Sequence, residues 1–339
     1  MIYIMDNLDS VLPLTPIAPV NNIKHVQNVT FVYFSNKAYF SYWYTHYMNI
    51  DGQTHLVDFF YPHDLIEPAM DRNNAFNRQF NTLLQTTEYK ELHFEKAIVL
   101  HIYTKAPSHE FAQIINLIYI YKTFNLQDYD IVVNIDIKNL GNSISSILEV
   151  FIDPNKIHYV DHDNKVFIKT GIIYNSTSSR ENIHVNYLVN ELKHFRVNKN
   201  QYEKICFIKN NGSKNLYSNI RMFDESYINY FSSKGYVFID PAGYHVIDLF
   251  NLIQDAKNVI FTWGSNSWVN SSYCNEQNNV MILCHIGYEH EYSTSFPCWT
   301  PVICNRLVKV TGLTSDPINN EVYKLFDKKL VELEEGIVE

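Results

Sequence analysis

Residues 205–284 contain four short apolar runs that alternate with helix-like stretches: ICFI (205–208), YVFI (236–239), VIFT (259–262) and VMILC (280–284). Amphipathic segments at 224–234 and 246–257 separate the first three runs, and a third segment opens at 264. This alternation predicts a βαβαβαβ unit, in which helices wrap a parallel sheet. Open sheets of this kind bind ligands at the carboxyl ends of their strands, where helix N-termini present N–H groups to phosphate. We therefore expect a nucleotide site in this half of the chain.

The first half of the chain repeats the same alternation less regularly. We expect strands at 29–34, 56–60, 97–103, 130–134, 156–160 and 165–169, and helices at 109–124, 142–151 and 180–195. The polar stretch NKNQ (198–201) is typical of a linker. The sequence thus predicts an α/β protein with two domains, 1–198 and 199–318, followed by a C-terminal helix at 319–339. Two domains joined by a short linker suggest a ligand cleft between them.

The composition is that of a folded globular protein. Of the 339 residues, 46% are hydrophobic and 19% are charged, and the net charge is -9. An acidic chain without a clustered basic face is a poor binder of nucleic acid or anionic lipid. No apolar run approaches the roughly 18 residues that span a bilayer, and the first residues lack the basic start of a signal peptide. With five cysteines and no CxxC pair, we expect reduced thiols and a cytoplasmic protein.

A polar turn follows the third apolar run directly. In Trp263-Gly264-Ser265-Asn266-Ser267, a glycine and three small polar residues allow backbone N–H groups and hydroxyls to approach a phosphate closely. The turn is not a Walker motif, because the GxxxxGK[ST] spacing is missing, and no predicted strand is followed by GxGxxG. We therefore disfavour P-loop and nicotinamide chemistry.

Cationic residues lie in the loop after the first apolar run. Lys209 follows ICFI immediately, and Arg221 ends the polar loop. Together they could grip a diphosphate, with Arg as a bidentate fork and Lys as a point charge. A solvated polar loop is the alternative interpretation of the same residues. Asp224 and Glu225 suit the N-cap and first turn of the next helix, so a structural role is sufficient for both.

Taken together, these segments resemble the signature half of the family 61 glycosyltransferases. Members typically carry an Arg followed three residues later by an Asn-Glu pair, a Gly-Phe strand leading to a proline, a helix ending near an Ala, and a Gly turn ending in Asn. The matching residues here are Arg221, Glu225 (with Asp224 in the Asn place), Gly235-Tyr236, Pro241, Ala256, Gly264, Ser265 and Asn270. Trp263 stands where many members have His, and Lys209 where Arg is usual. The resemblance covers residues 100–285.

The resemblance implies a GT-B fold, in which two Rossmann-like domains face each other across a cleft. It also implies an inverting, metal-independent transfer of a sugar from a nucleotide-sugar donor to a glycan or glycoconjugate acceptor, without a cofactor. The donor-binding residues would be Lys209, Arg221, Glu225, Gly264, Ser265, Asn266, Ser267 and Asn270. His109 is the expected general base, because histidine can take and release a proton near neutral pH. A capping histidine is the structural alternative.

Other interpretations stay open at this point. Asp161-His162-Asp163 is a DxD, by which metal-dependent glycosyltransferases hold a divalent cation. It lies between KIHYV and KVFIK, however, where such residues are ordinary hairpin-turn material. The departures at 209 and 263 leave room for a non-catalytic binding or scaffold protein of the same fold, and an epimerase or phosphorylase is a third interpretation. The sequence leaves the donor base, the acceptor and the oligomeric state open.

Overall fold

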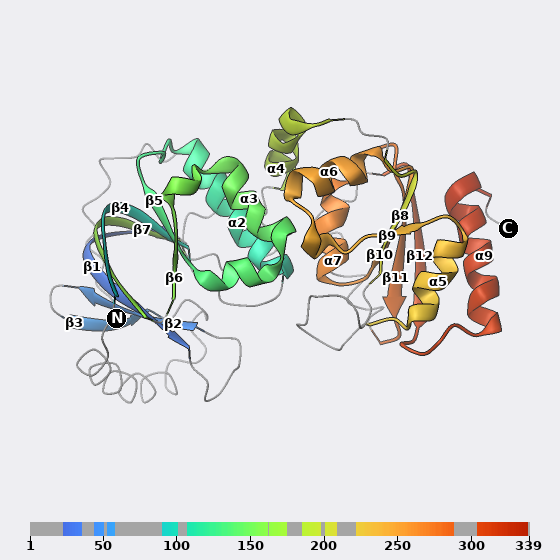
Figure 1. The fold of residues 1–339 in the computed structure, drawn as a ribbon, viewed down its shortest axis with the longest axis horizontal. Helices are drawn as coiled ribbons and strands as arrows, with labels where there is room; N and C mark the ends of the chain where they lie inside the picture. Colours follow the sequence, from blue (N-terminus) through green and yellow to red (C-terminus); the bar gives the residue numbers. More distant parts are fainter. Residues whose placement is uncertain are drawn as a thin grey trace. The chain divides into compact units, whose positions relative to one another are not determined.

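A computed structural model describes residues 23–35, 44–50, 53–57, 90–100, 107–161, 163–174, 185–197, 201–208, 222–287 and 304–337. The chain divides into two compact units (Figure 1). Unit 1 comprises residues 1–105, 116–139 and 148–182, and unit 2 comprises 106–115, 140–147 and 183–339. Both units are therefore discontinuous in sequence, and the predicted domain boundaries at 198 and 318 stay predictions.

Unit 2 is built on a five-stranded sheet in the order β12-β11-β10-β8-β9, and every neighbouring pair is parallel. Its strands are β8 (Lys204–Phe207), β9 (Val237–Phe238), β10 (Asn258–Thr262), β11 (Asn279–His285) and β12 (Arg306–Leu313). All residues of β10 and β11 are buried, as is typical of parallel strands covered on both faces. The expected α/β alternation with a parallel sheet is confirmed in this unit, and β12 adds a strand that the sequence pattern did not predict.

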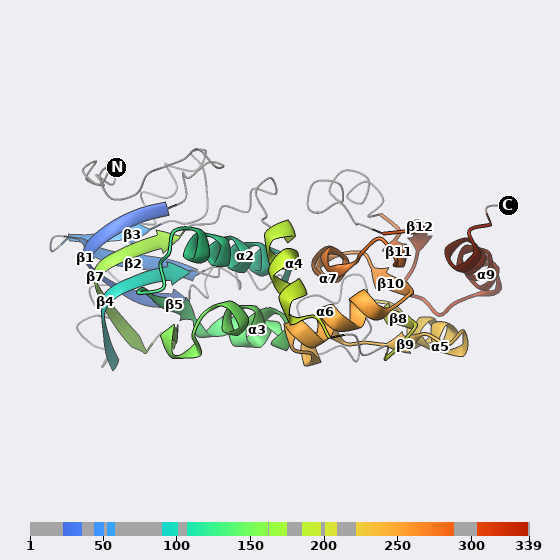
Figure 2. The same ribbon diagram turned by 90° about the horizontal axis from the view of Figure 1, so that it is seen from above.

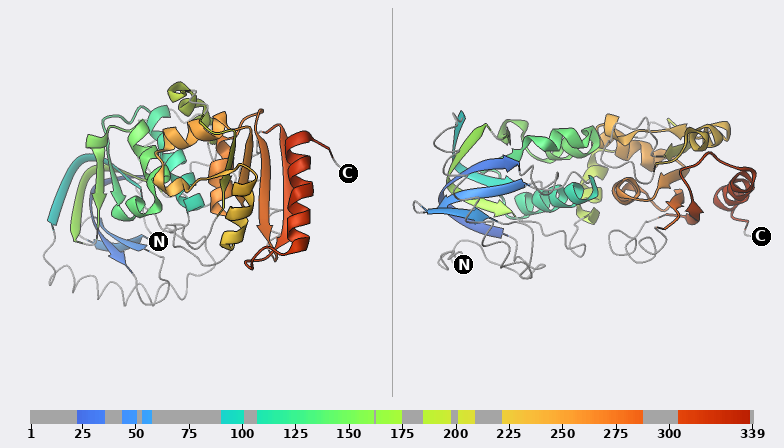
Figure 3. Two further views of the ribbon diagram at one scale, coloured as in Figure 1. Left: turned by 45° about the vertical axis from the view of Figure 1, so that its right-hand side comes forward. Right: turned by 90° about the horizontal axis from the view of Figure 1, so that it is seen from below.

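The helices of unit 2 lie on both faces of the sheet. Figures 1 and 2 show α5 (Glu225–Ser233) and α9 (Asn320–Glu335) on one face, and α6 (Val246–Asp255) and α7 (Ser265–Asn270) on the other. In Figure 3 the red helix α9 runs beside β12, which it contacts. Fully buried side chains from α5 and α9, including Phe231 and Phe326, pack on the sheet. Each such side chain contributes about 1.5–3 kcal/mol through burial.

Helix α5 has well-defined caps at both ends. The Asp224 carboxylate accepts the Ser226 backbone N–H at 2.8 Å, which satisfies an otherwise unpaired donor. At the other end Gly235 has a φ of 85°, which favours glycine. Its N–H donates to the Ser232 carbonyl, and the Tyr236 N–H donates to the Phe231 carbonyl, in a Schellman arrangement. Gly235 is therefore the C′ residue, as the sequence predicts.

Unit 1 contains a mixed seven-stranded sheet in the order β3-β2-β1-β7-β4-β5-β6. Its strands are β1 (Ile23–Ser35), β2 (Tyr44–Ile50), β3 (Gln53–Val57), β4 (Lys90–Leu100), β5 (Asp130–Asn134), β6 (Ile157–Val160) and β7 (Asn164–Tyr174). The pairs β7–β4, β4–β5 and β5–β6 are parallel, whereas β1 pairs antiparallel with β7 and β2, and β2 with β3. The expectation of a wholly parallel sheet is wrong here. Ile50 lies opposite Gln53, and the intervening Asp-Gly dipeptide is a hairpin signal that we did not use.

Three further α-helices are described: α2 (Pro107–Thr123), α3 (Asn142–Phe151) and α4 (Val185–Leu192). The first two contribute residues to both units, because 107–115 and 142–147 belong to unit 2. Gly141, just before α3, lies so close to residue 242 of unit 2 that an added Cβ would sit 2.9 Å from the Ala242 Cα. Within the described residues, no helix combines the length and apolar character that a membrane crossing requires.

Candidate functional site

The strand order of unit 2 places a topological switch point between β8 and β10. From β8, the chain goes first to β9 on one side of the strand and then to β10 on the other. Taken in sequence order the strands are arranged 2-1-3-4-5, the flavodoxin-like order. Open α/β sheets bind ligands at the carboxyl ends of the strands beside such a switch point. β8 ends at this edge, and the turn at 263–267 begins here directly after β10.

A side-chain hydrogen bond joins the two strands at this edge. The Thr262 hydroxyl, from the last residue of β10, donates to the carbonyl of Phe207, the last residue of β8, at 3.1 Å. The aromatic rings of Phe207 and Phe261 stack with centroids 5.1 Å apart and both are fully buried. Buried contacts therefore hold the carboxyl ends of β8 and β10 together.

Gly264 gives the turn after β10 its shape. Its φ of 129° and ψ of -158° fall in a region that is essentially restricted to glycine. The buried Ser267 hydroxyl donates to the Gly264 carbonyl at 2.9 Å and accepts the Gly264 N–H at 3.1 Å. These bonds give Ser267 a structural part in the turn. A direct contact between Ser267 and a ligand stays a prediction.

The structure describes the other predicted donor-binding residues only in part. Asn270 is the last residue of α7 and is buried, with 2% of its surface exposed. Ser265 and Asn266 form the first turn of α7, but their side chains lie outside the described set. Lys209 and Arg221 both lie outside the described residues, so the proposed cationic grip remains a prediction.

The N-terminus of α5 carries negative charge. Asp224 caps the helix, and Glu225 follows as its exposed first residue. The hydrogen bonds from Ser226, first from its side chain and then from its backbone, lower the pKa of the Asp224 carboxyl, so the carboxylate is ionised at neutral pH. A phosphate would be repelled at this helix end, and the structural roles expected for Asp224 and Glu225 fit the geometry. A contact from Glu225 to a donor stays a prediction.

His109 lies in the first turn of α2, within unit 2. The helix begins at Pro107, which is favoured at the first position because its missing N–H would be unpaired there anyway. The His109 side chain is outside the described set. Its role as the general base is therefore untested by the geometry.

His285 is a residue at this edge that the sequence pattern did not single out. It ends β11, is 6% exposed, and stacks on Phe223 with ring centroids 4.1 Å apart. Phe223 directly precedes the cap of α5. The only sequence signal was a histidine at the end of the VMILC run, and a strand-ending histidine by itself does not indicate a site. Trp263, 2% exposed, also fills the interior at this edge.

The DxD residues form a turn but not a hairpin. The Asp161 carboxylate accepts the Asp163 N–H at 3.0 Å, and the Asn164 side chain accepts the Asp161 N–H at 3.0 Å. Such contacts are typical of an Asx turn. The flanking strands β6 and β7 are not neighbours in the sheet, so the hairpin expected here is wrong. Among the described residues, no three His, Cys, Asp or Glu side chains gather in a way that could hold a metal ion.

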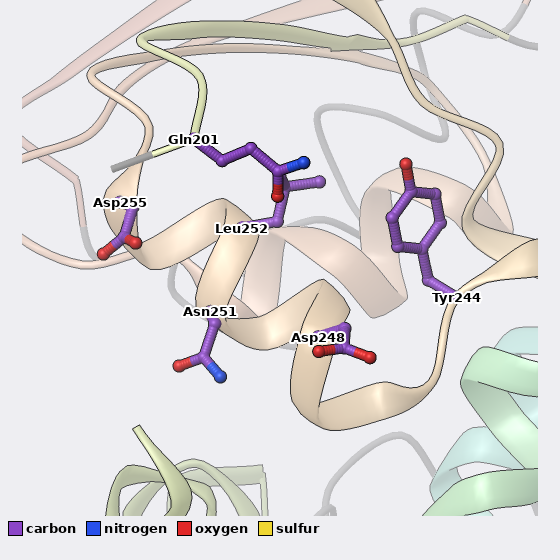
Figure 4. A pocket seen from close by; sticks show the side chains of 6 residues that line it. All are labelled: Gln201, Tyr244, Asp248, Asn251, Leu252 and Asp255. Atoms are coloured by element: carbon purple, nitrogen blue, oxygen red, sulfur yellow. The ribbon is translucent and has the colours of Figure 1, made fainter. Parts of the chain in front are cut away.

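A separate polar pocket of about 250 Å³ lies along α6. Its lining residues come from α6, from the turn before it and from the segment before β8, and Figure 4 shows all six: Gln201, Tyr244, Asp248, Asn251, Leu252 and Asp255. Arg196 fixes one end of the pocket by donating to Asp255 and to the Gln254 side chain, at 2.8 and 2.7 Å. The sequence pattern gave no indication of this pocket.

No protein-family model matches the chain, and no curated protein matches its sequence. The resemblance to family 61 glycosyltransferases therefore remains an interpretation of the residues quoted above.

Proposed function

We propose that the protein is a glycosyltransferase that holds the diphosphate of a nucleotide-sugar donor at the carboxyl edge of the unit 2 sheet, between β8 and β10. The observation that carries this proposal is the 2-1-3-4-5 strand order, with its switch point where β8 and β10 end and the turn at 263–267 begins. A switch point is where open α/β sheets bind ligands.

The local chemistry favours a diphosphate at the β10 turn rather than at α5. The α5 N-terminus already holds the Asp224 carboxylate, with Glu225 beside it. The cap residue of the turn, Gly264, has no side chain, so backbone groups there can approach a ligand closely. In this proposal Lys209 and Arg221 offset the charge of the diphosphate as the bond to the sugar breaks.

The finer features of the proposal rest on the family resemblance. They are a GT-B arrangement, inversion at the anomeric carbon, independence from metal, a glycan or glycoconjugate acceptor, and His109 as the base. In such a transfer the base takes the proton of an acceptor hydroxyl as its oxygen attacks C1 of the sugar. The bond from C1 to the diphosphate oxygen breaks, and the nucleoside diphosphate leaves with both bonding electrons.

The test is donor turnover by the full chain with a panel of UDP- and GDP-sugars. We expect Arg221→Ala and Lys209→Ala each to lower donor hydrolysis and transfer by about 100-fold or more, since each removes a charge from the transition state. Lys324→Ala, an exposed lysine on α9, is the matched control and should keep full activity. Undiminished turnover in both site variants would contradict the donor assignment. A chelator should have little effect, and strong inhibition by it would instead favour Asp161 and Asp163.

A second candidate is a non-catalytic binding protein that keeps the same fold. It is favoured by Trp263, whose buried side chain stands where many family members have His. Calorimetry with nucleoside diphosphates and their sugars separates the candidates. Binding without turnover of any donor would favour the non-catalytic protein, and binding with turnover would favour the transferase.

A further inference from the structure

The α6 pocket is independent of the proposed donor site. None of its six lining residues lies on β8, on β10 or in the turn at 263–267. Its volume of about 250 Å³ is just below the roughly 300–1,000 Å³ of pockets that hold drug-sized ligands. A ligand of one ring is therefore the size that fits.

The carboxylates of the lining disfavour anions. An anion would meet the carboxylates of Asp248 and Asp255. The Asp255 carboxylate attracts a cation only weakly, because the Arg196 guanidinium lies 2.8 Å from it and only 3% of the Asp255 side chain is exposed. Asp248 is then the one carboxylate of the described lining that could attract a cation, so the test below includes cations. Leu252 is the only aliphatic residue of the described lining, so an apolar ligand would leave the polar groups around it without partners. A neutral polar ligand fits this mixture of carboxylate, amide and phenol groups best.

The lining offers both donors and acceptors. Carboxylates only accept, amides and phenols do both, and the described lining holds all three through Asp248, Gln201 and Tyr244. Figure 4 shows the Gln201 amide and the Tyr244 ring extending from segments outside α6, while Asp248 extends from the helix itself. A ligand hydroxyl can donate to a carboxylate and accept from an amide at once, and an aromatic ring offers an apolar surface to the C–H face of a sugar.

Asn251 supplies an unmatched donor in the pocket wall. It is 2% exposed, and its Oδ1 accepts the Val197 backbone N–H at 3.0 Å. Its Nδ2 has no hydrogen-bond acceptor among the described residues, although buried polar groups are normally paired. Because Nδ2 is covered, a ligand oxygen reaches it only when the wall around Asn251 shifts. Binding is then expected to change the environment of this amide.

We propose that the α6 pocket binds a neutral, hydroxyl-rich ring, such as a single sugar residue, with Gln201, Tyr244 and Asp248 as its contacts. The inference does not rest on the proposed transferase activity, since it involves other residues. It would give the protein a sugar-binding subsite away from the donor diphosphate.

The test is saturation-transfer NMR of the full chain with methyl glycosides of common hexoses, together with amide spectra that follow the Asn251 side chain. We expect binding with a Kd of about 1 mM and a shift of the Asn251 amide resonances. Gln201→Ala and Tyr244→Ala should each raise the Kd by roughly 3- to 10-fold, the loss expected for one hydrogen bond. Gln277→Ala, an exposed glutamine outside the pocket, is the matched control and should leave the Kd unchanged.

Three results would overturn the proposal. One is the absence of saturation transfer for every glycoside, and another is a Kd that neither pocket variant changes. The third is a shift of the Asn251 amide with spermidine or Ca²⁺ but not with the glycosides, which would assign the pocket to cations. Arg221→Ala separates this inference from the donor site. It should lower donor turnover by about 100-fold or more and leave glycoside binding intact, whereas loss of glycoside binding in that variant would place the sugar at the donor site instead.

Discussion

Replacing Gly141 with alanine should destabilise unit 2 through two separable effects. Gly141 has a φ of 95°, and a Cβ there would lie 2.9 Å from both the Cα and the Cβ of Ala242. The positive φ costs an L-residue about 1–2 kcal/mol, and overpacking of a closely packed contact costs typically 1–3 kcal/mol. We therefore expect Gly141→Ala to lower the free energy of unfolding by about 2–5 kcal/mol.

Two other glycines of unit 2 separate the backbone effect from the contact. Gly235 has a φ of 85°, and a Cβ added there would meet no described atom within 4 Å, so Gly235→Ala should cost only the backbone component of about 1–2 kcal/mol. Gly243 has neither a positive φ nor a close neighbour among the described residues, so Gly243→Ala should be neutral or stabilise by about 0.4–1 kcal/mol. Urea unfolding followed by circular dichroism measures all three. If Gly141→Ala costs no more than Gly235→Ala, the close approach to Ala242 is refuted.

Three further predictions concern buried polar groups of unit 2. The Tyr273 hydroxyl is buried without a hydrogen-bond partner among the described residues. Tyr273→Phe should therefore raise the free energy of unfolding by about 1 kcal/mol. A loss of stability would instead indicate that the hydroxyl has a partner outside the described residues. Burial, followed by the charge of Asp316, raises the pKa of Tyr227 to about 12, so the folded state favours the neutral phenol. The contribution of Tyr227 to the free energy of unfolding should be full below pH ~10 and fall by about 3 kcal/mol towards pH ~12. Unfolding curves of Tyr227→Phe should lack this part of the fall. The Asn279 side chain is hydrogen-bonded to the Asn258 and Asn305 side chains, at 2.9 and 2.8 Å. Asn279→Ala should therefore lower the free energy of unfolding, measured by thermal unfolding, by about 1–3 kcal/mol. An unchanged free energy would show that these two side-chain hydrogen bonds are dispensable.

Local sequence patterns were sufficient to predict the buried strands of unit 2 and the caps of α5. Continuous apolar runs such as VIFT identify strands that are covered on both faces, and Asp224 and Gly235 mark the ends of α5 as the structure has them. The strand β12 was missed because RLVKVTGL alternates apolar and polar residues, a pattern of a half-exposed edge strand, and we relied on uninterrupted runs. The antiparallel strand β2 was missed for the same reason.

Features that depend on tertiary contacts could not be read from the sequence. The assignment of the first halves of α2 and α3 to unit 2 comes from packing between distant segments. For the site, the glycine turn after β10 was predicted, but its φ of 129° and the bonds to Ser267 were not. His285 and the α6 pocket were also missed, since their residues gain significance only from neighbours that are far away in the chain.

The most direct test of the donor site is a crystal structure of the full chain soaked with UDP or GDP. The account predicts a diphosphate at the carboxyl ends of β8 and β10, with its oxygens within hydrogen-bond distance of backbone N–H groups in the turn at 263–267. A nucleotide that binds only elsewhere, such as in the α6 pocket or at the amino ends of the strands, would contradict it.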